Sequence, residues 1–157
     1  MPELVKKSVD TAQLLETYRD LLKTVDSLPL LVSGNSMAPF LVHKRDTVYL
    51  KRIDSPLRIG DIVLYQRQNG DYILHRICKI EGNTYCMIGD AQTVVETGIH
   101  HEQVFARVGW AIRKGKVQKT GRFWWFFFEK IWIRIIPYRK KAQRLYSFFL
   151  KWYRGGN

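Results

Sequence analysis

Ser36 is the residue of this sequence whose surroundings most suggest chemistry. It lies in the segment 34–39, of sequence GNSMAP, where a glycine allows close approach of the backbone and a proline fixes the exit of the turn. A serine hydroxyl is a weak nucleophile and needs a neighbouring base. We therefore treat Ser36 as a candidate nucleophile if the fold brings a base to it, and otherwise as a turn residue.

Four histidines are available as that base. His43 lies in a basic turn, and His100 and His101 lie in a polar loop, so we expect these three imidazoles to be solvated. His75 differs because it stands in the middle of an apolar, strand-like run, YILHRI. An imidazole in such a strand is either a hydrogen-bonded sheet residue, which is the commoner case, or a positioned base.

Three further short segments accompany Ser36 and His75. They are Arg45-Asp46, Gly60-Asp61-Ile62-Val63 and Gly89-Asp90. In this order, the five segments resemble those of the type I signal peptidase family and its relatives. The resemblance covers residues 31–112, roughly half of the chain, and five ordered motifs are more specific than any one of them.

The resemblance implies a role for each matching residue. The family's serine nucleophile carries over to Ser36, and His75 occupies the place of the base in the branch found in the endoplasmic reticulum, in archaea and in some Gram-positive bacteria. The aspartate of the Gly-Asp motif maps onto Asp90, which would orient His75 as the third member of a Ser-His-Asp set. A second family acid falls near Glu96, a weaker candidate. The sequence departs from the family at 91–92, where Ala-Gln stands in place of asparagines.

The implied reaction is acyl transfer. His75 would take the proton of Ser36 as Oγ attacks a peptide carbonyl. Backbone N–H groups near the serine would hold the oxyanion, so we assign Gly34, Asn35 and Met37 to oxyanion and substrate binding. The resemblance further implies cleavage after small residues, beside a membrane-inserted peptide.

The two cysteines, Cys78 and Cys86, lie at equal distances in sequence from Gly82. If residues 81–83 form a hairpin loop, the two thiols face each other across the ladder. We expect free thiols in preference to a bridge, because disulfides are uncommon in proteins that are not secreted. No third or fourth ligand stands at metal spacing near them, so we expect no metal and no other cofactor.

Charge and aromatic residues are concentrated towards the C-terminus. The 157 residues are 46% hydrophobic and 25% charged, which permits a packed core. Residues 1–30 carry a net charge of −1 and residues 31–110 a net charge of +1, whereas residues 111–157 hold 13 basic side chains, one acid and 13 of the aromatic residues. The sequence therefore predicts a near-neutral globular unit with a basic aromatic tail, which disfavours a protein that coats nucleic acid uniformly.

The pattern of apolar residues predicts a mainly β fold. A one-sided apolar stripe over 9–25 predicts an amphipathic helix, either a brace packed on the domain or a face for a partner. Short β-type runs separated by turns then predict a small antiparallel β-domain, which the resemblance makes one of the signal peptidase type. The predicted strands are 30–33, 46–50, 61–66, 71–80, 84–88 and 105–112. The predicted units are the helix at 1–28, the catalytic domain at 29–115 and the tail at 116–157.

The tail has the composition of a segment that lies in a membrane interface. Residues 123–136 are strongly apolar but number 14 and include Glu129, Lys130 and Arg134, so they do not suit a spanning helix. Residues 138–154 predict a second helix with interleaved aromatic and basic side chains. We expect residues 123–154 to bind membrane lipid; folding back onto the domain, docking in a partner and, last, binding nucleic acid are the alternatives.

These expectations give a membrane-associated serine endopeptidase that removes a leader or signal segment from exported or membrane-associated peptides, including small modified ones. No signal peptide opens the chain, so we expect the domain on the cytoplasmic side. The alternative is a catalytically inactive relative that binds peptides or a partner at the membrane. A self-cleaving, DNA-binding regulator is disfavoured, because the first 30 residues hold one helix and a net charge of −1.

Overall fold

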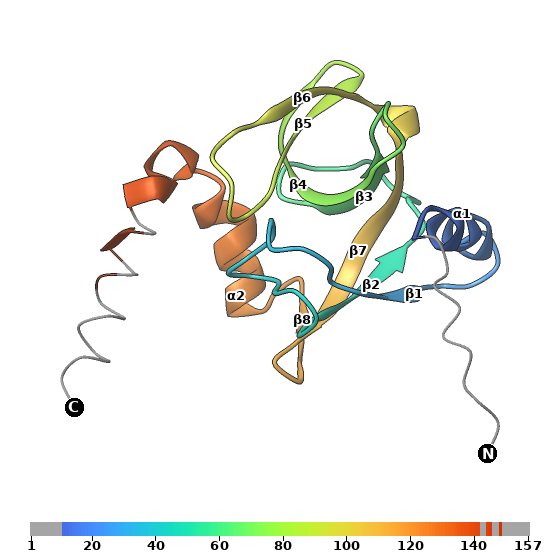
Figure 1. Cartoon of the computed structure of the whole chain (residues 1–157), viewed down its shortest axis with the longest axis horizontal. Helices are drawn as coiled ribbons and strands as arrows, with labels where there is room; N and C mark the ends of the chain where they lie inside the picture. The colour runs from blue at the N-terminus through green and yellow to red at the C-terminus, as the bar shows by residue number, and fades with distance from the viewer. Residues whose placement is uncertain (1–10, 142–143, 146–147, 149–157) are drawn as a thin grey trace.

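The computed structural model describes residues 11–141, 144–145 and 148 of the chain. Its strands form one antiparallel sheet in the order β1-β2-β7-β3-β4-β5-β6, with β8 paired to β7 (Figure 1). The strands are β1 (Leu28–Leu31), β2 (Thr47–Lys51), β3 (Ile62–Gln66), β4 (Tyr72–Glu81), β5 (Thr84–Ile88), β6 (Glu96–His100), β7 (Val104–Arg113) and β8 (Lys116–Lys119). The helical elements are α1 (Thr11–Leu21), η1 (His101–Gln103), α2 (Phe123–Phe126), η2 (Phe127–Trp132) and η3 (Ile136–Tyr138). The predicted mainly-β, antiparallel class is confirmed.

The sheet curves around and buries apolar side chains on both of its faces. Strand β3 shows this best, because successive side chains of a strand point to opposite faces. Ile62 and Leu64 enter one apolar cluster together with residues of β2 and β7. Val63 and Tyr65 enter a second cluster with residues of β4, β5 and β6. A strand buried on both faces carries few polar residues, which explains the run Ile-Val-Leu-Tyr.

Two tight turns set the register of the strands that carry the site. The predicted Asn69-Gly70 turn joins β3 to β4, and Gly70 adopts the positive φ of 92° that such a turn requires. The turn at Gly82 joins β4 to β5. A register shift between Ile77 and Lys79 places Lys79, not Cys78, opposite Cys86. Both thiols are free, and Cys78 donates a hydrogen bond to the Cys86 carbonyl at 3.2 Å.

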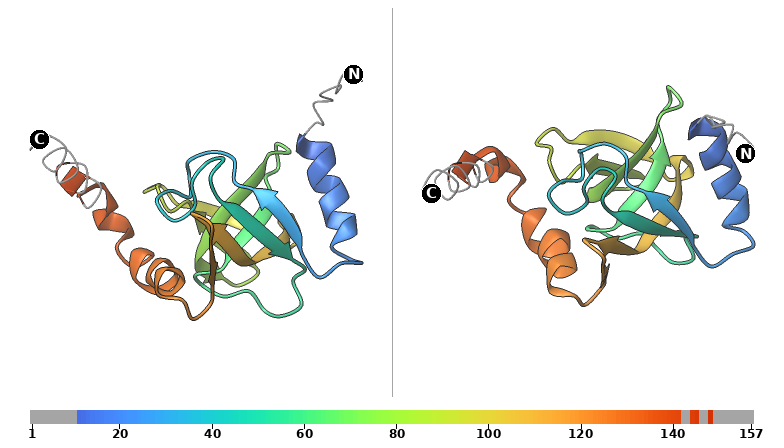
Figure 2. Two further views of the ribbon diagram at one scale, coloured as in Figure 1. Left: turned by 90° about the horizontal axis from the view of Figure 1, so that it is seen from below. Right: turned by 60° about the horizontal axis from the view of Figure 1, so that its bottom comes forward.

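Helix α1 packs on the sheet at the end away from α2 (Figures 1 and 2). Its apolar stripe places Leu15, followed by Leu22 just beyond the helix, in the first cluster, each 3% exposed. The Tyr18 hydroxyl donates to the Pro29 carbonyl at 2.8 Å and so ties the helix to β1. These contacts are those of a brace.

Residues beyond 115 first add strand β8 to the sheet and then pack against the domain as helical turns. Strand β8 pairs with β7, so the boundary expected at 115/116 falls inside the sheet. Trp125 and Phe128 are buried against Phe40, with ring centroids 5.8 and 4.8 Å from it. In the part of the chain that the structure describes, no helix combines the length and the apolar character needed to cross a bilayer. Most of the helix predicted at 138–154 lies outside the described residues.

Candidate active site

The Ser36 turn follows β1 and is held by contacts on both sides. Gly34 has a φ of 84°, a conformation that favours glycine, and its N–H donates to Nδ1 of His43 at 2.9 Å. His43 is therefore a support of this turn, whereas the sequence suggested a solvated side chain. On the other side, the Ser36 carbonyl accepts a hydrogen bond from the N–H of Ala91 at 2.8 Å.

Gly89 lets the loop that follows β5 approach the Ser36 turn. A Cβ atom at Gly89 would overlap the Ser36 carbonyl oxygen, so the contact requires a residue without a side chain. The Gly-Asp motif at 89–90 is thus packed directly behind the serine. This gives the motif glycine a physical role in positioning the turn.

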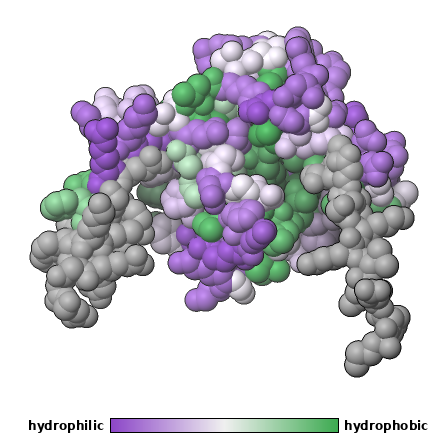
Figure 3. Space-filling view, in the orientation of Figure 1, coloured by the Kyte–Doolittle hydropathy of each residue, from purple (hydrophilic) through white to green (hydrophobic). Residues whose placement is uncertain are grey.

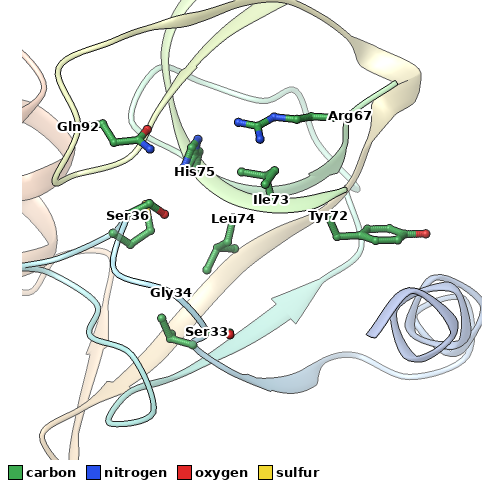
Figure 4. Close-up of a pocket in the computed structure, with 11 residues that line it drawn as sticks. Ser33, Gly34, Ser36, Arg67, Tyr72, Ile73, Leu74, His75 and Gln92 are labelled. Carbon is green, nitrogen blue, oxygen red and sulfur yellow. The ribbon is translucent and has the colours of Figure 1, made fainter. Parts of the chain in front are cut away.

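Ser36 and His75 line one cavity of about 190 Å³. β5 begins to pair with β4 at Arg76, so residues 72–75 have β3 on one side and the cavity on the other. Segment 32–34 and Ser36 line the cavity from the end of β1, and Gln92 from the loop after β5. Ser36, Gln92 and His75 gather at one end of this space (Figure 4). The middle of this face of the molecule is hollowed, and hydrophobic residues show there between hydrophilic borders (Figure 3).

The geometry around His75 assigns its two ring nitrogens. The Tyr65 hydroxyl lies 3.4 Å from His75 Nδ1 and donates its one proton to Oε2 of Glu96 at 2.7 Å. Towards His75 the phenol oxygen is then left to accept, which favours the tautomer that has its proton on Nδ1. In this tautomer Nε2 carries the lone pair that a general base requires. Among the described residues, Ser36 Oγ and His75 make no direct hydrogen bond with each other; such contacts commonly tighten when substrate binds.

An ion pair holds Glu96, which is linked to His75 through the Tyr65 hydroxyl. Arg67 donates to both carboxylate oxygens of Glu96, at 2.8 and 2.6 Å. This pairing, opposed by burial and aided by the Tyr65 hydrogen bond, lowers the pKa of Glu96, so the carboxylate is ionised at neutral pH. Glu96, the weaker of the two acids in the sequence-based interpretation, is therefore the one connected to His75, through Tyr65.

Asp90 lies elsewhere. Its carboxylate accepts two hydrogen bonds from Arg76, at 3.0 and 2.8 Å, and both side chains are fully buried. Arg76 also donates to the Gly60 carbonyl at 2.8 Å. Because neighbours on a strand point to opposite faces, the partner of Arg76 is on the opposite side of β4 from the Tyr65 contact of His75. The expected orientation of His75 by Asp90 is thus corrected: the contact to Nδ1 comes from Tyr65.

The three residues assigned to oxyanion and substrate binding have different positions. Gly34 and Met37 line the cavity, although the Gly34 N–H is already bonded to His43. Asn35 is exposed and is not among the residues that line the cavity; its carbonyl accepts from the N–H of Ala38 at 3.1 Å. The sequence analysis missed Tyr65, Arg67 and Gln92. Tyr65 had a detectable signal, because the Asn-Gly turn fixes the register that brings it to the face of His75.

The side chains that line the site indicate which chemistry it could perform. In the described part of the chain, no three His, Cys, Asp or Glu side chains gather so that they could hold a metal ion. A hydroxyl, an imidazole with a lone pair and nearby main-chain N–H groups suit nucleophilic attack on a carbonyl.

No family model matches the chain, and no curated protein matches it.

A pH profile tests the state of His75. Burial lowers the pKa of this imidazole to about 4, an effect that the charge of Glu96 partly opposes. Under the hypothesis that His75 is the general base of a peptidase, which must act unprotonated, kcat/KM for peptide cleavage is expected to rise with pH through about 4 and to be level from about 5.5 to 7.5. An unshifted imidazole, with a pKa of about 6.5, would instead lose about tenfold between pH 7.5 and 5.5.

The same shift affects folding, so stability is the control for this profile. Between about pH 4 and 6.5 the unfolded chain binds the proton at His75 and the folded chain does not, so stability falls as the pH is lowered through this window. Circular dichroism at each pH identifies unfolding. An activity midpoint at or above pH 6.5 in folded protein would contradict the assignment of His75 as the buried base.

Proposed function

We propose that this protein is a serine endopeptidase of the signal peptidase type, with Ser36 as nucleophile and His75 as general base. The observation that carries the proposal is that both residues line the same cavity, although they are 39 positions apart in the sequence. The convergence of the other motif residues supports it. Arg76 joins Gly60 to Asp90, and Gly89 packs against the Ser36 carbonyl.

The substrate that fits this cavity is an extended peptide. Residues 72–75, whose edge away from β3 is not paired with β5, line it on one side and residues 32–34 on the other, and strand edges bind peptides through backbone hydrogen bonds. A volume of about 190 Å³, shared between the backbone and the side chains of a substrate, favours small side chains beside the bond that is cut. This agrees with a leader or signal segment that ends in small residues.

The reaction proceeds in two acyl transfers. Nε2 of His75 accepts the Ser36 proton as Oγ attacks the peptide carbonyl, and the resulting imidazolium gives this proton to the leaving amine. Water, deprotonated in its turn by His75, then hydrolyses the acyl-enzyme and restores Ser36. Tyr65 and Glu96 hold the proton on Nδ1 throughout and stabilise the imidazolium.

Comparison of new peptide N-termini tests the proposal directly. Cells that produce the wild-type protein and cells that produce Ser36→Ala at matched levels are compared by mass spectrometry. We expect a set of termini, each following a small residue in an exported or membrane-associated precursor, that is present with the wild type and absent with the variant. Identical termini in both would contradict the peptidase and favour the inactive, peptide-binding relative.

We further propose that the aromatic segment 123–141 lies in the interface of a membrane. Its buried face is used by the domain, but Phe123, Trp124 and Phe126 are 69, 45 and 51% exposed. Exposed aromatic side chains beside cations are typical of interfacial segments, and the cations are drawn to anionic lipid.

Vesicle binding tests this interface. We expect the full chain to co-sediment with anionic vesicles, more weakly at high salt, and the triple change Phe123→Ser, Trp124→Ser, Phe126→Ser to weaken binding at least tenfold, which requires only about 1.4 kcal/mol. The matched control changes three exposed aliphatic residues elsewhere, Ile59, Val94 and Val117, to serine. Equal binding of the two triple variants would contradict the proposed interface.

A further inference from the structure

A fully buried arginine joins the C-terminal segment to the loop behind the candidate nucleophile. Arg139 is 0% exposed. Its Nη1 donates to the carbonyls of Gly89 and Gln92, at 2.9 and 3.1 Å. Its Nε and Nη2 donate to the carbonyl of Trp132, at 3.3 and 3.1 Å. The guanidinium thus connects residue 139 with Trp132, seven residues earlier in the C-terminal segment, and with the loop after β5.

Trp132 makes a second connection to the same loop. Its indole N–H donates to the carbonyl of Asp90 at 2.8 Å. The Arg139 guanidinium lies over the Trp132 ring, 5.4 Å from the centroid, so the two side chains brace each other. Together they bind the carbonyls of three of the four residues from 89 to 92.

The loop that they bind is the one that positions Ser36. Gly89 contacts the Ser36 carbonyl, and the N–H of Ala91 donates to it at 2.8 Å. Gln92 lines the cavity, and its side-chain oxygen accepts from the N–H of Gly89 at 3.1 Å. A shift of this loop would therefore move the serine and one wall of the cavity together.

Packing alone does not account for an arginine at this place. Withdrawal of a guanidinium from water is costly, and an apolar side chain of similar size would fill the space without that cost. What an apolar side chain lacks is a set of donors with fixed directions that can hold carbonyl groups of separate segments in one geometry.

We propose that Arg139 and Trp132 are positioning residues that hold the 89–92 loop, and through it Ser36, in the geometry for attack. The proposal rests on the proposed peptidase function for its kinetic consequence, but the loop contact itself does not. It makes residues 123–139 part of the catalytic unit as well as its proposed contact with lipid. A peptidase deprived of this segment would keep Ser36 and His75 and still lose catalysis.

Hydrogen exchange and kinetics on the full chain test the proposal together. In Arg139→Gln we expect the amide of Ala91 to exchange at least tenfold faster, with exchange in β3 unchanged. We expect kcat to fall at least tenfold and KM to rise by a smaller factor, because the loop positions the nucleophile and, through Gln92, one wall of the cavity. Arg139→Lys, which keeps the charge and fewer donors, should restore part of kcat. Trp132→Phe should show the same effects in a weaker form.

Arg134→Gln is the matched control, because it removes an exposed cation from the same segment. If exchange at Ala91 and kcat match this control in the Arg139 and Trp132 variants, the proposal is overturned. If β3 exchanges as fast as the loop in every variant, the residues serve general stability and the positioning role is overturned. If the loop loosens as expected but the wild type cleaves nothing, the contact stands and the peptidase function fails.

Discussion

His75→Ala is expected to lower kcat for peptide cleavage by about 10³-fold or more, while peptide binding is retained. The tautomer that the Tyr65 contact favours has its lone pair on Nε2, and without the imidazole no other residue that lines the cavity can act as a base on the Ser36 hydroxyl at neutral pH. The double variant Ser36→Ala, His75→Ala should have a kcat within about threefold of that of His75→Ala, because the two residues act as one unit. The substrate is a synthetic peptide that spans a cleavage site found by the comparison of N-termini.

His100→Ala is the control for this series, because this histidine is exposed and does not line the cavity with Ser36. It should leave kcat within about twofold. A large further loss in the double variant would mean that Ser36 retains activity without His75 and that a different base acts on it. Unchanged kcat in His75→Ala, with folded protein, would remove His75 from the mechanism.

The fold was predictable where local signals were strong. The β-type runs on either side of the Asn-Gly turn predicted β3 and β4 within one residue of their ends. Strands β6 and β8 were missed for physical reasons. The first contains Gly98, and the second is four residues long with two exposed lysines, so neither shows the apolar pattern of a strand. Their pairing is determined by β5 and β7, which the local sequence does not show.

Ser36 and His75, the nucleophile and base that the sequence suggests, line the same cavity, whereas the hydrogen-bond partners of the candidate site were not predictable. Ser36 and His75 carry recognisable surroundings, but the partner of each depends on which face of a strand it points to. Arg76 follows His75 directly and must face the other way. Because a buried guanidinium requires an anionic partner, Asp90 could have been predicted as the partner of Arg76. The pairing of Arg67 with Glu96, 29 residues apart, depends on how β6 meets the turn after β3.

Asp90→Ala is expected to lower the free energy of unfolding by about 3–5 kcal/mol, a large part of the stability of a small domain. The change leaves the Arg76 guanidinium fully buried and without its carboxylate partner, so that the Gly60 carbonyl remains as its hydrogen-bond acceptor. Urea unfolding followed by circular dichroism measures the loss. A double variant, Arg76→Met with Asp90→Leu, should be less destabilised than Asp90→Ala, because it removes the unpaired charge.

The same variant separates a structural from a catalytic role of Asp90. Since the contact to Nδ1 of His75 comes from Tyr65, kcat of Asp90→Ala should stay within about tenfold of the wild type at a temperature where the variant is folded. A third member of a Ser-His-Asp set would instead cost about 10⁴-fold in kcat with little loss of stability. Glu81→Ala, which breaks the exposed pair with Lys79, controls for the loss of a surface charge and should change neither quantity appreciably. Large stability loss with retained kcat would assign the Gly-Asp motif to the framework that supports Ser36, and the orientation of the base to Tyr65 and Glu96.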